Sequence, residues 1–336
     1  MSIAKLCSAR SQWFPPTPSF TEVNLPSQKG KVFIVTGGNA GVGYELCKIL
    51  YTTGAIIYMA SRSKEKAESA IESIISLKPA PSTPGNLKFL HLDLNELESV
   101  KQAASSFAEQ ESKLDVLWNN AGTGANMVDP GAKTAQGLDA MMGMHCVATL
   151  LFTELLVPQL RASIEPDNPG STRVVWTSSY LAEGASPING ISFEHLQNGI
   201  SDRTANYAAS KAGTWILGDE FANRHGKEGI LSIIQNPGNL KAGSYAGTPA
   251  LAMWFINPLL HPPKFGAYTQ LYAGLSPEVS LDNNGAYVIP WGRIRPNNDC
   301  PRQDIIKAIT STEQGGLGYG KLFWEWCEEQ WKPFML

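Results

Sequence analysis

The residues of this chain whose types and spacing most clearly suggest catalysis are a tyrosine and a lysine four positions apart. They stand in Tyr207-Ala208-Ala209-Ser210-Lys211, inside a stretch over 207–224 that is typical of a helix. Residues four apart share one helix face, so the ammonium would lie beside the phenol. A neighbouring cation favours the phenolate form. Such a phenol could give a proton to a ketone being reduced, or take one from an alcohol being oxidised. The pattern alone also fits a half-buried tyrosine on an amphipathic helix.

A glycine-rich turn follows the first apolar run of the chain. The residues 32–35 are β-formers, Thr36-Gly37-Gly38-Asn39-Ala40-Gly41-Val42-Gly43 comes next, and 42–51 reads as a helix. Glycines allow a tight turn and a close approach of the backbone to a pyrophosphate, and the free amides of the following helix face the anion. The strand–loop–helix context therefore predicts a dinucleotide site rather than a simple turn. The predicted contacts are Gly37, Asn39, Ala40, Gly41, Val42 and Gly43.

The end of the second predicted strand indicates which dinucleotide is bound. An NAD-selective site would place a carboxylate about 20 residues after the glycines. This chain has Ala60-Ser61-Arg62 there, with Lys66 one helical turn later. A guanidinium suits a 2′-phosphate by charge and by bidentate hydrogen bonding. We therefore predict NADP(H), with Ser61, Arg62 and Lys66 as contacts. The alternative is that Arg62 is an ordinary solvated residue at a helix start.

With these motifs the chain resembles the short-chain dehydrogenase/reductase superfamily, including retinol-dehydrogenase-like and fungal tailoring reductases. Leu92-Asp93-Leu94, Asn119-Asn120-Ala121-Gly122 and Pro237-Gly238 match further motifs of that superfamily, in order, so the resemblance spans about residues 30 to 240. It implies hydride transfer between a nicotinamide and a carbonyl or hydroxyl carbon. It also implies cofactor contacts from Asp93, Leu94, Asn120, Ala121, Gly122, Tyr207, Lys211, Pro237, Gly238 and Leu240.

The resemblance also assigns a serine. Ser179, at the end of the predicted strand 173–177, resembles the catalytic serine, whose hydroxyl would bond the substrate oxygen as charge develops there. Its neighbour Ser178 is the competing candidate. No Gly-x-Ser-x-Gly elbow surrounds the pair, which argues against a serine hydrolase.

Three departures from the family pattern concern the site. Ser179 and Tyr207 stand 28 positions apart, a wide spacing that retinol-dehydrogenase-like members share, and the extra residues include 193–196. His145 stands where the family often has a catalytic Asn that holds a water of a proton relay. It could maintain that relay as a catalytic residue, alter its pH dependence, or simply pack. Leu240-Lys241-Ala242 follows Pro-Gly, where a threonine is expected.

The elements that must position these residues alternate regularly. Predicted strands at 32–35, 55–59, 87–90, 116–118, 173–177 and 230–234 are separated by predicted helices at 42–51, 64–77, 97–107 and 143–156, the last ended by Pro158. This order predicts an α/β fold with a doubly wound, Rossmann-type parallel sheet. We expect a Pro-rich arm over 1–29 and one catalytic domain over 30–336, in which 240–336 forms a substrate lid and a C-terminal extension.

Composition excludes several other classes of protein. The formal net charge is −3 and no basic block occurs, so nucleic-acid binding has no electrostatic support. The five cysteines and five histidines lack the spacing of a disulfide framework or a metal site, so no metal is predicted. No apolar window of about 18 residues occurs, so we expect no transmembrane segment, and a cytoplasmic location.

Aromatic residues near the site indicate the substrate class. The expected lining is apolar, which favours a hydrophobic ketone, aldehyde or secondary alcohol, such as a polyketide-like, terpenoid or retinoid compound of secondary metabolism. Core or lid packing is the alternative for these side chains. The residues are Tyr180, Leu181, Trp215, Tyr245, Trp254 and Phe255.

Two questions about partners and activity stay open at this level. The amphipathic segment 321–336 would dock on its own fold, contact another subunit, or attach to a membrane surface. The helices that carry His145 and Tyr207 could support a homodimer. Instead of a reductase, the same fold could serve a non-redox cyclase or isomerase, a cofactor-binding sensor, or a scaffold.

Overall fold

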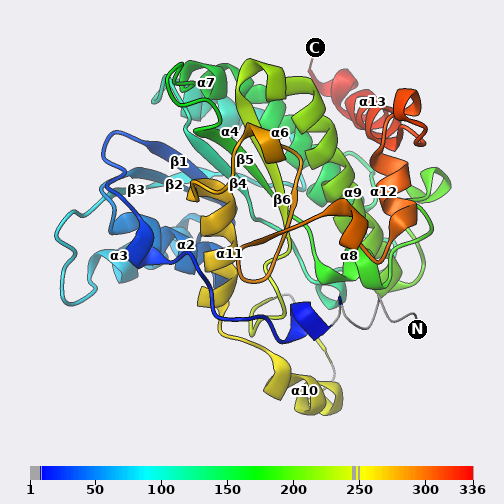
Figure 1. Ribbon diagram of the computed structural model, residues 1–336, viewed down its shortest axis with the longest axis horizontal. Helices are drawn as coiled ribbons and strands as arrows, with labels where there is room; N and C mark the ends of the chain where they lie inside the picture. Colours follow the sequence, from blue (N-terminus) through cyan, green and yellow to red (C-terminus); the bar gives the residue numbers. More distant parts are fainter. Residues whose placement is uncertain (1–7, 9, 244–246, 249, 336) are drawn as a thin grey trace.

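One twisted sheet runs through the protein (Figure 1). The structure, a computed structural model, describes residues 8, 10–243, 247–248 and 250–335. The strand order is β3-β2-β1-β4-β5-β6-β7-β8. All neighbouring pairs are parallel except β7 and β8, which are antiparallel. This confirms the predicted doubly wound sheet. The strands are β1 Val32–Thr36, β2 Ile56–Ser61, β3 Asn86–His91, β4 Val116–Asn119, β5 Thr172–Thr177, β6 Ile230–Gln235, β7 Tyr287–Ile289 and β8 Arg293–Arg295.

Helices cover both faces of the sheet, which explains the continuous apolar strands. Successive side chains of β1 alternate between the faces: Val32 and Ile34 join the core on one side, and Phe33 and Val35 the core on the other. The first core contains residues of α4 Leu97–Ala108, α6 Thr149–Leu155 and α9 Arg203–His225. The second contains residues of α2 Gly41–Tyr51, α3 Lys64–Ile75 and α11 Pro263–Leu275.

The helix around His145 is not regular. It consists of α5 Ala140–Met142, a π-helical stretch over Gly143–Ala148, and α6. The predicted helix over 143–156 ends at Leu155, close to its predicted bound, but a further helix follows, which was not predicted. Pro158 stands in the first turn of α7 Val157–Ala162, where a backbone N–H has no intrahelical partner and its loss costs little.

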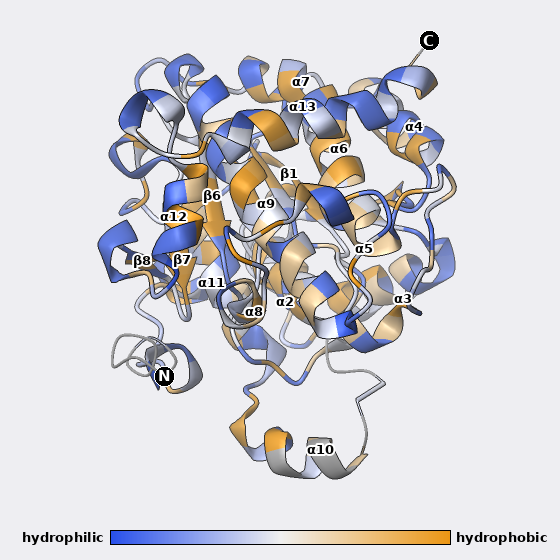
Figure 2. Ribbon diagram, turned by 90° about the vertical axis from the view of Figure 1, so that its right-hand side faces the viewer, coloured by the Kyte–Doolittle hydropathy of each residue, from blue (hydrophilic) through white to orange (hydrophobic). Residues whose placement is uncertain are grey.

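The chain after Gly238 takes part in the main fold, which the sequence pattern did not predict. β7 and β8 extend the sheet, and α11 packs against α2 and against β4, β5 and β6. The short helix α10 Ala250–Ile256 projects beyond the body of the protein (Figures 1 and 2). The remaining helices are α8 Tyr180–Gly184, α12 Gln303–Ile309 and α13 Tyr319–Trp331.

The C-terminal helix docks on its own fold. Phe323, Trp324 and Cys327 of α13 are buried in the same core as α9. Arg224 of α9 lies over the ring of Trp324, with its guanidinium carbon 4.3 Å from the ring centroid. Of the three roles considered for this helix, the structure therefore shows intramolecular docking.

Some of the N-terminal residues are helical and others pack on the body. Residues 10–13 form a helical turn, and Glu22–Asn24 a short 3₁₀ turn. Phe20 is buried and meets Tyr272 of α11 edge to face. Within the described part of the chain, the helices are too short or too polar to span a membrane.

Candidate active site

The predicted site residues gather at one edge of the sheet. The glycine turn follows β1, Asn120 follows β4, Ser179 follows β5, and Pro237 follows β6. All four strands are parallel, so their carboxyl ends meet at the same edge. Ligands of open α/β sheets bind at this edge.

The glycine turn has no room for side chains where it meets the end of β4. A Cβ on Gly43 would lie 2.5 Å from the Asn120 Nδ2 atom, and Gly37 has a φ of +68°, which favours glycine. Gly41, with a φ of +57°, has more space around it. The atom nearest to a Cβ added there would be the Cβ of Ala242, at 3.7 Å. No side chain caps the start of α2. Its first amides are therefore available to an anion.

The Asn-Asn-Ala-Gly turn holds the glycine turn in place. The Thr36 hydroxyl oxygen accepts the backbone N–H groups of Asn120 and Ala121, each at 2.9 Å. The Asn120 amide donates to the Thr36 carbonyl at 2.7 Å and accepts from Gln270 of α11 at 2.6 Å. Thr36 was not among the predicted site residues, although its place directly before the first glycine could have identified it.

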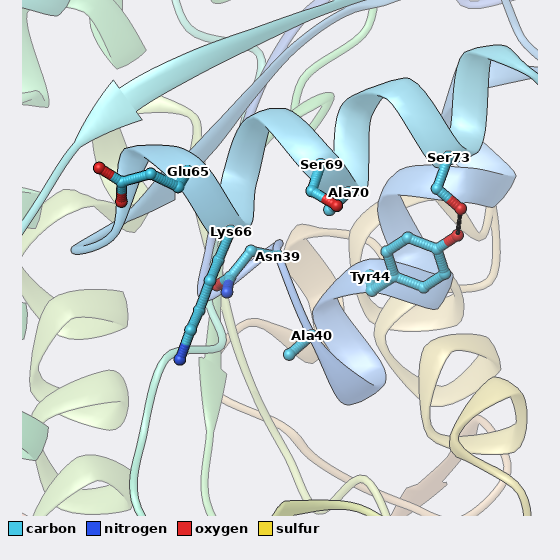
Figure 3. A pocket seen from close by; sticks show the side chains of 8 residues that line it. All are labelled: Asn39, Ala40, Tyr44, Glu65, Lys66, Ser69, Ala70 and Ser73. Carbon is cyan, nitrogen blue, oxygen red and sulfur yellow. Dashed lines mark hydrogen bonds between the residues drawn. The ribbon is translucent and has the colours of Figure 1, made fainter.

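A surface pocket lies between the glycine turn and α3 (Figure 3). It has a volume of about 500 Å³ and is lined by Asn39, Ala40, Tyr44, Glu65, Lys66, Ser69, Ala70 and Ser73. The Lys66 side chain extends from α3 past Asn39, whereas Glu65 points away (Figure 3). Arg62 is exposed at the start of this region, and the hydroxyl of Ser61 is buried without a hydrogen-bond partner. Of Ser61, Arg62 and Lys66, only Lys66 lines the pocket, whereas Ser61 and Arg62 precede α3 in the chain.

The third-strand motif lies at the same edge. Asp93 is half-buried and accepts the backbone N–H of Asn95 through Oδ1 at 3.0 Å. Leu94, also half-buried, packs against the core on the α4 side. The motif is thus a turn that presents one carboxylate beside the end of β3.

Tyr207 and Lys211 meet on the inner face of α9. The Lys211 Nζ atom lies 5.9 Å from the centroid of the Tyr207 ring and donates to the Thr177 carbonyl at 3.0 Å. Both side chains are buried, with exposed fractions of 8% for Tyr207 and 4% for Lys211. Burial lowers the pKa of Lys211 to about 8. The hydrogen bond to Thr177 holds the Lys211 ammonium at the end of β5, and Thr177 lies two residues before Ser179 in the chain.

The two serines after β5 have different surroundings. Ser178 is buried, and its hydroxyl donates to the Lys211 carbonyl at 2.9 Å. Ser179 is half-exposed, and its hydroxyl oxygen accepts the backbone N–H of Leu181 at 3.2 Å as the cap of α8. An accepting hydroxyl keeps its own proton for another partner. Ser179 is therefore the serine that can donate to a molecule at the sheet edge.

His145 has a protein partner at each ring nitrogen. Nε2 accepts the backbone N–H of Thr123 at 3.1 Å, which leaves the proton on Nδ1. Nδ1 lies 2.8 Å from the Ser210 hydroxyl, which itself donates to the Tyr207 carbonyl. Burial and the nearby Lys211 charge hold the pKa of His145 well below its usual value. The ring is thus a neutral link between the Gly122–Thr123 turn and α9.

The segment after β6 reaches back to the glycine turn. Gly238 has a φ of +93°, and a Cβ there would lie 2.5 Å from the Trp291 ring. Leu240 is buried, with its side chain so near α11 that a Cβ on Gly266 would lie 2.4 Å from it. Pro237, which lies in sequence between the end of β6 and Gly238, is half-buried.

Comparison with known proteins decides the family. The family model for short chain dehydrogenases matches residues 31–193. The short-chain dehydrogenase/reductase iacJ of Pestalotiopsis fici is 47% identical over 337 residues, which cover 98% of this chain and 99% of that protein. This chain belongs to the short-chain dehydrogenase/reductase family. The resemblance inferred from its motifs is thereby confirmed.

Two solved structures share the fold of this chain. A protein of Mycobacterium paratuberculosis superposes with a TM-score of 0.65 at 24% identity, covering 94% of this chain and 97% of that one. L-sorbose reductase from Gluconobacter frateurii, solved in complex with NADPH and L-sorbose, gives a TM-score of 0.59 at 19% identity, with 78% and 95% coverage.

Not every aromatic residue expected around the substrate lies at this edge of the sheet. Trp215 belongs to the buried core and packs on Tyr287 with ring centroids 4.3 Å apart, so its assignment as a lining residue is wrong. Trp254 lies on the projecting α10 and is 71% exposed. Tyr245 and the side chain of Phe255 lie outside the described residues. Tyr180 and Leu181, half-exposed, follow Ser179 directly.

Proposed function

We propose that this short-chain dehydrogenase/reductase is an NADPH-dependent carbonyl reductase that acts on a hydrophobic ketone or aldehyde, or oxidises the corresponding secondary alcohol. The observation that carries the proposal is the buried Lys211, held by Thr177 at 3.0 Å and lying 5.9 Å from the Tyr207 ring. A buried ammonium next to a phenol at the carboxyl edge of a parallel sheet suits acid–base work on a bound oxygen.

The residues of the chain divide the work at the substrate oxygen. NADPH, when bound, supplies the hydride. Tyr207 gives the proton to the oxygen that gains negative charge, and the Ser179 hydroxyl donates a hydrogen bond to the same oxygen. The Lys211 ammonium favours the phenolate that Tyr207 leaves behind. In the oxidation direction Tyr207 takes the proton instead.

The unbonded donor groups near the glycine turn, and the space above that turn, fit NADPH. The uncapped amides of α2 and the space over Gly41 suit the pyrophosphate. Asp93 and Leu94 would border the adenine, and Asn120, Ala121, Gly122, Pro237 and Gly238 the nicotinamide half. The orphaned Ser61 hydroxyl, the exposed Arg62, and Lys66 beside Asn39 suit a 2′-phosphate. Buried Leu240 is the weakest member of the predicted set.

His145 fits a positioning role better than a relay. Its ring connects the Thr123 amide to Ser210, so it ties the turn beside the nicotinamide site to the helix of Tyr207. Both ring nitrogens are bonded within the protein, which leaves none for a relay water. The His145 carbonyl is also bonded, by the Thr214 hydroxyl at 3.3 Å.

The Tyr207→Phe substitution tests the acid–base assignment. We expect turnover to fall by about a hundredfold or more, because the proton donor is lost. The affinity for NADPH, measured by fluorescence titration, should stay within about twofold, since the ring and its packing remain. Product formation from a ketone panel with unchanged NADPH absorbance would instead favour a non-redox cyclase or isomerase.

The double substitution Arg62→Ala with Lys66→Ala tests the choice of NADPH. Two cations facing a 2′-phosphate contribute about 1.5–3 kcal/mol each when hydrogen-bonded, so the Kd of NADPH should rise at least tenfold while that of NADH changes little. Lys64→Ala is the matched control, because Lys64 is exposed on the same helix and pairs with Glu68 at 3.8 Å. Equal Kd values for NADPH and NADH in the wild type would refute the preference.

A further inference from the structure

The N-terminal helical turn lies at the sheet edge that carries the site, although it is far from the site in sequence. In Figure 1 the dark blue turn lies at the same end of the molecule as α8. Gln12 in this turn is 1% exposed, the burial of a core residue. The position of the turn is therefore set by contacts with the body.

Gln12 bridges two segments that follow the central strands. Its amide nitrogen donates to the Glu183 carboxylate in α8 at 3.3 Å, and its amide oxygen accepts from Asn236, directly after β6, at 2.8 Å. Glu183 in turn pairs with Arg295 of β8, and both side chains are buried. A buried amide bonded on both sides is costly to displace, so the turn is held firmly on α8 and on the end of β6.

The backbone on both sides of Gln12 is anchored as well. Arg293 donates to the Ser11 carbonyl at 2.7 Å, and the ring nitrogen of His261 lies 3.3 Å from the Trp13 carbonyl. These partners come from the first residue of β8 and from the segment before α11. Together with the two partners of Gln12, four separate segments thus hold the backbone that carries Trp13.

Trp13 forms an aromatic pair with the residue that follows Ser179. Its ring meets Tyr180 edge to face, with centroids 6.1 Å apart and an interplanar angle of 81°. Both residues are half-exposed, unlike the buried Gln12 between its anchors. A rigidly held and partly exposed aromatic pair offers a large apolar surface, and one of its members directly follows Ser179 in the chain.

We propose that Trp13 and Tyr180 form one wall of the substrate site, and that the N-terminal turn selects carbonyl compounds with a bulky apolar group. Gln12 is the positioning residue of this wall. The inference rests on the proposed function for the identity of the reacting group, but the wall itself is a binding surface that can be tested without turnover.

The test compares two ketones of different size on the full-length protein with NADP(H) bound. In Trp13→Ala, the KM for acetonaphthone should rise about fivefold to tenfold with kcat little changed, because an aromatic contact is lost. The KM for acetone and the Kd of NADPH should not change. Phe14→Ala is the matched control, since Phe14 is the next residue and is 65% exposed. Trp13→Phe, which keeps an aromatic face, should give an intermediate KM and also covers the case that Trp13→Ala does not fold.

Calorimetric binding of acetonaphthone to the NADP⁺ complex separates this inference from the proposed function. If the wild type binds the ketone in this complex but oxidises no NADPH with any ketone of the panel, and Trp13→Ala weakens the binding, the reductase proposal fails and the wall stands. The proposed wall would be refuted if Trp13→Ala left the KM and Kd of acetonaphthone unchanged. An equal change in the KM of acetone would also refute it. So would a wild type that neither binds nor reduces acetonaphthone.

Discussion

Individual residues at the site differ in charge state because they differ in burial and partners. Lys211 is buried, and this burial lowers its pKa to about 8. His145 is buried beside that ammonium, and a second positive charge there is unfavourable, which holds its pKa well below the usual value. At neutral pH the site thus holds one cation and one neutral imidazole.

These charge states predict the pH dependence of reduction. The Lys211 ammonium is lost as pH rises through about 8, so kcat/KM should fall on the alkaline side of that value. His145 stays neutral, so no limb due to it should appear between about pH 5 and 7. His145→Asn should lower activity without changing the shape of the profile. An acidic limb that disappears in His145→Asn would show that the imidazole titrates and takes part in proton transfer.

At the scale of elements, the sheet edge is held by a helix from the C-terminal third of the chain. α11 crosses near β4, where the Trp118 indole donates to the Gln270 carbonyl at 2.9 Å. A Cβ on Gly274 would lie 2.2 Å from the Trp118 ring. Gln270 of the same helix also bonds Asn120. The close approach of α11 therefore supports the Asn-Asn-Ala-Gly turn at the edge of the sheet.

The Gly274→Ala substitution tests this contact. The added methyl group must displace the Trp118 ring from a filled core, so the free energy of unfolding should fall by about 1–3 kcal/mol in denaturant titrations. Gly243→Ala is the control, because a Cβ there meets nothing within 4 Å. Equal stability of the two variants would mean that the core accommodates the methyl group without strain.

At the scale of the whole molecule, the C-terminal helix α13 covers part of α9, the helix that carries Tyr207. Phe323 and Trp324 are buried there, and a Cβ on Gly213 of α9 would lie 3.0 Å from the Phe323 ring. The surface that the sequence suggested for a homodimer is thus partly occupied by the chain itself. A second subunit would have to displace a well-packed helix, which costs the burial of several large side chains.

We therefore expect the mass of one chain in solution, checked by sedimentation over a wide concentration range. Trp324→Ala should lower the free energy of unfolding by about 3–5 kcal/mol, because it leaves a cavity under α13. Leu322→Ala, at a position that is 50% exposed on the same helix, should have little effect. A stable dimer of the wild type would show that another surface mediates assembly.

The sequence by itself determined the order of the strands up to β6, the glycine turn, the Asn-Asn-Ala-Gly turn and the pairing of Tyr207 with Lys211. Each of these is a local pattern, and the geometry of a strand, turn or helix brings its members together. Only the tertiary structure decided that Ser178 turns inward while Ser179 stays available, that both nitrogens of His145 are bonded, and that Trp215 is core. It also decided that Gln12 lies beside Glu183. These outcomes depend on contacts between segments many residues apart. A local sequence pattern does not determine which of two neighbouring side chains makes such a contact.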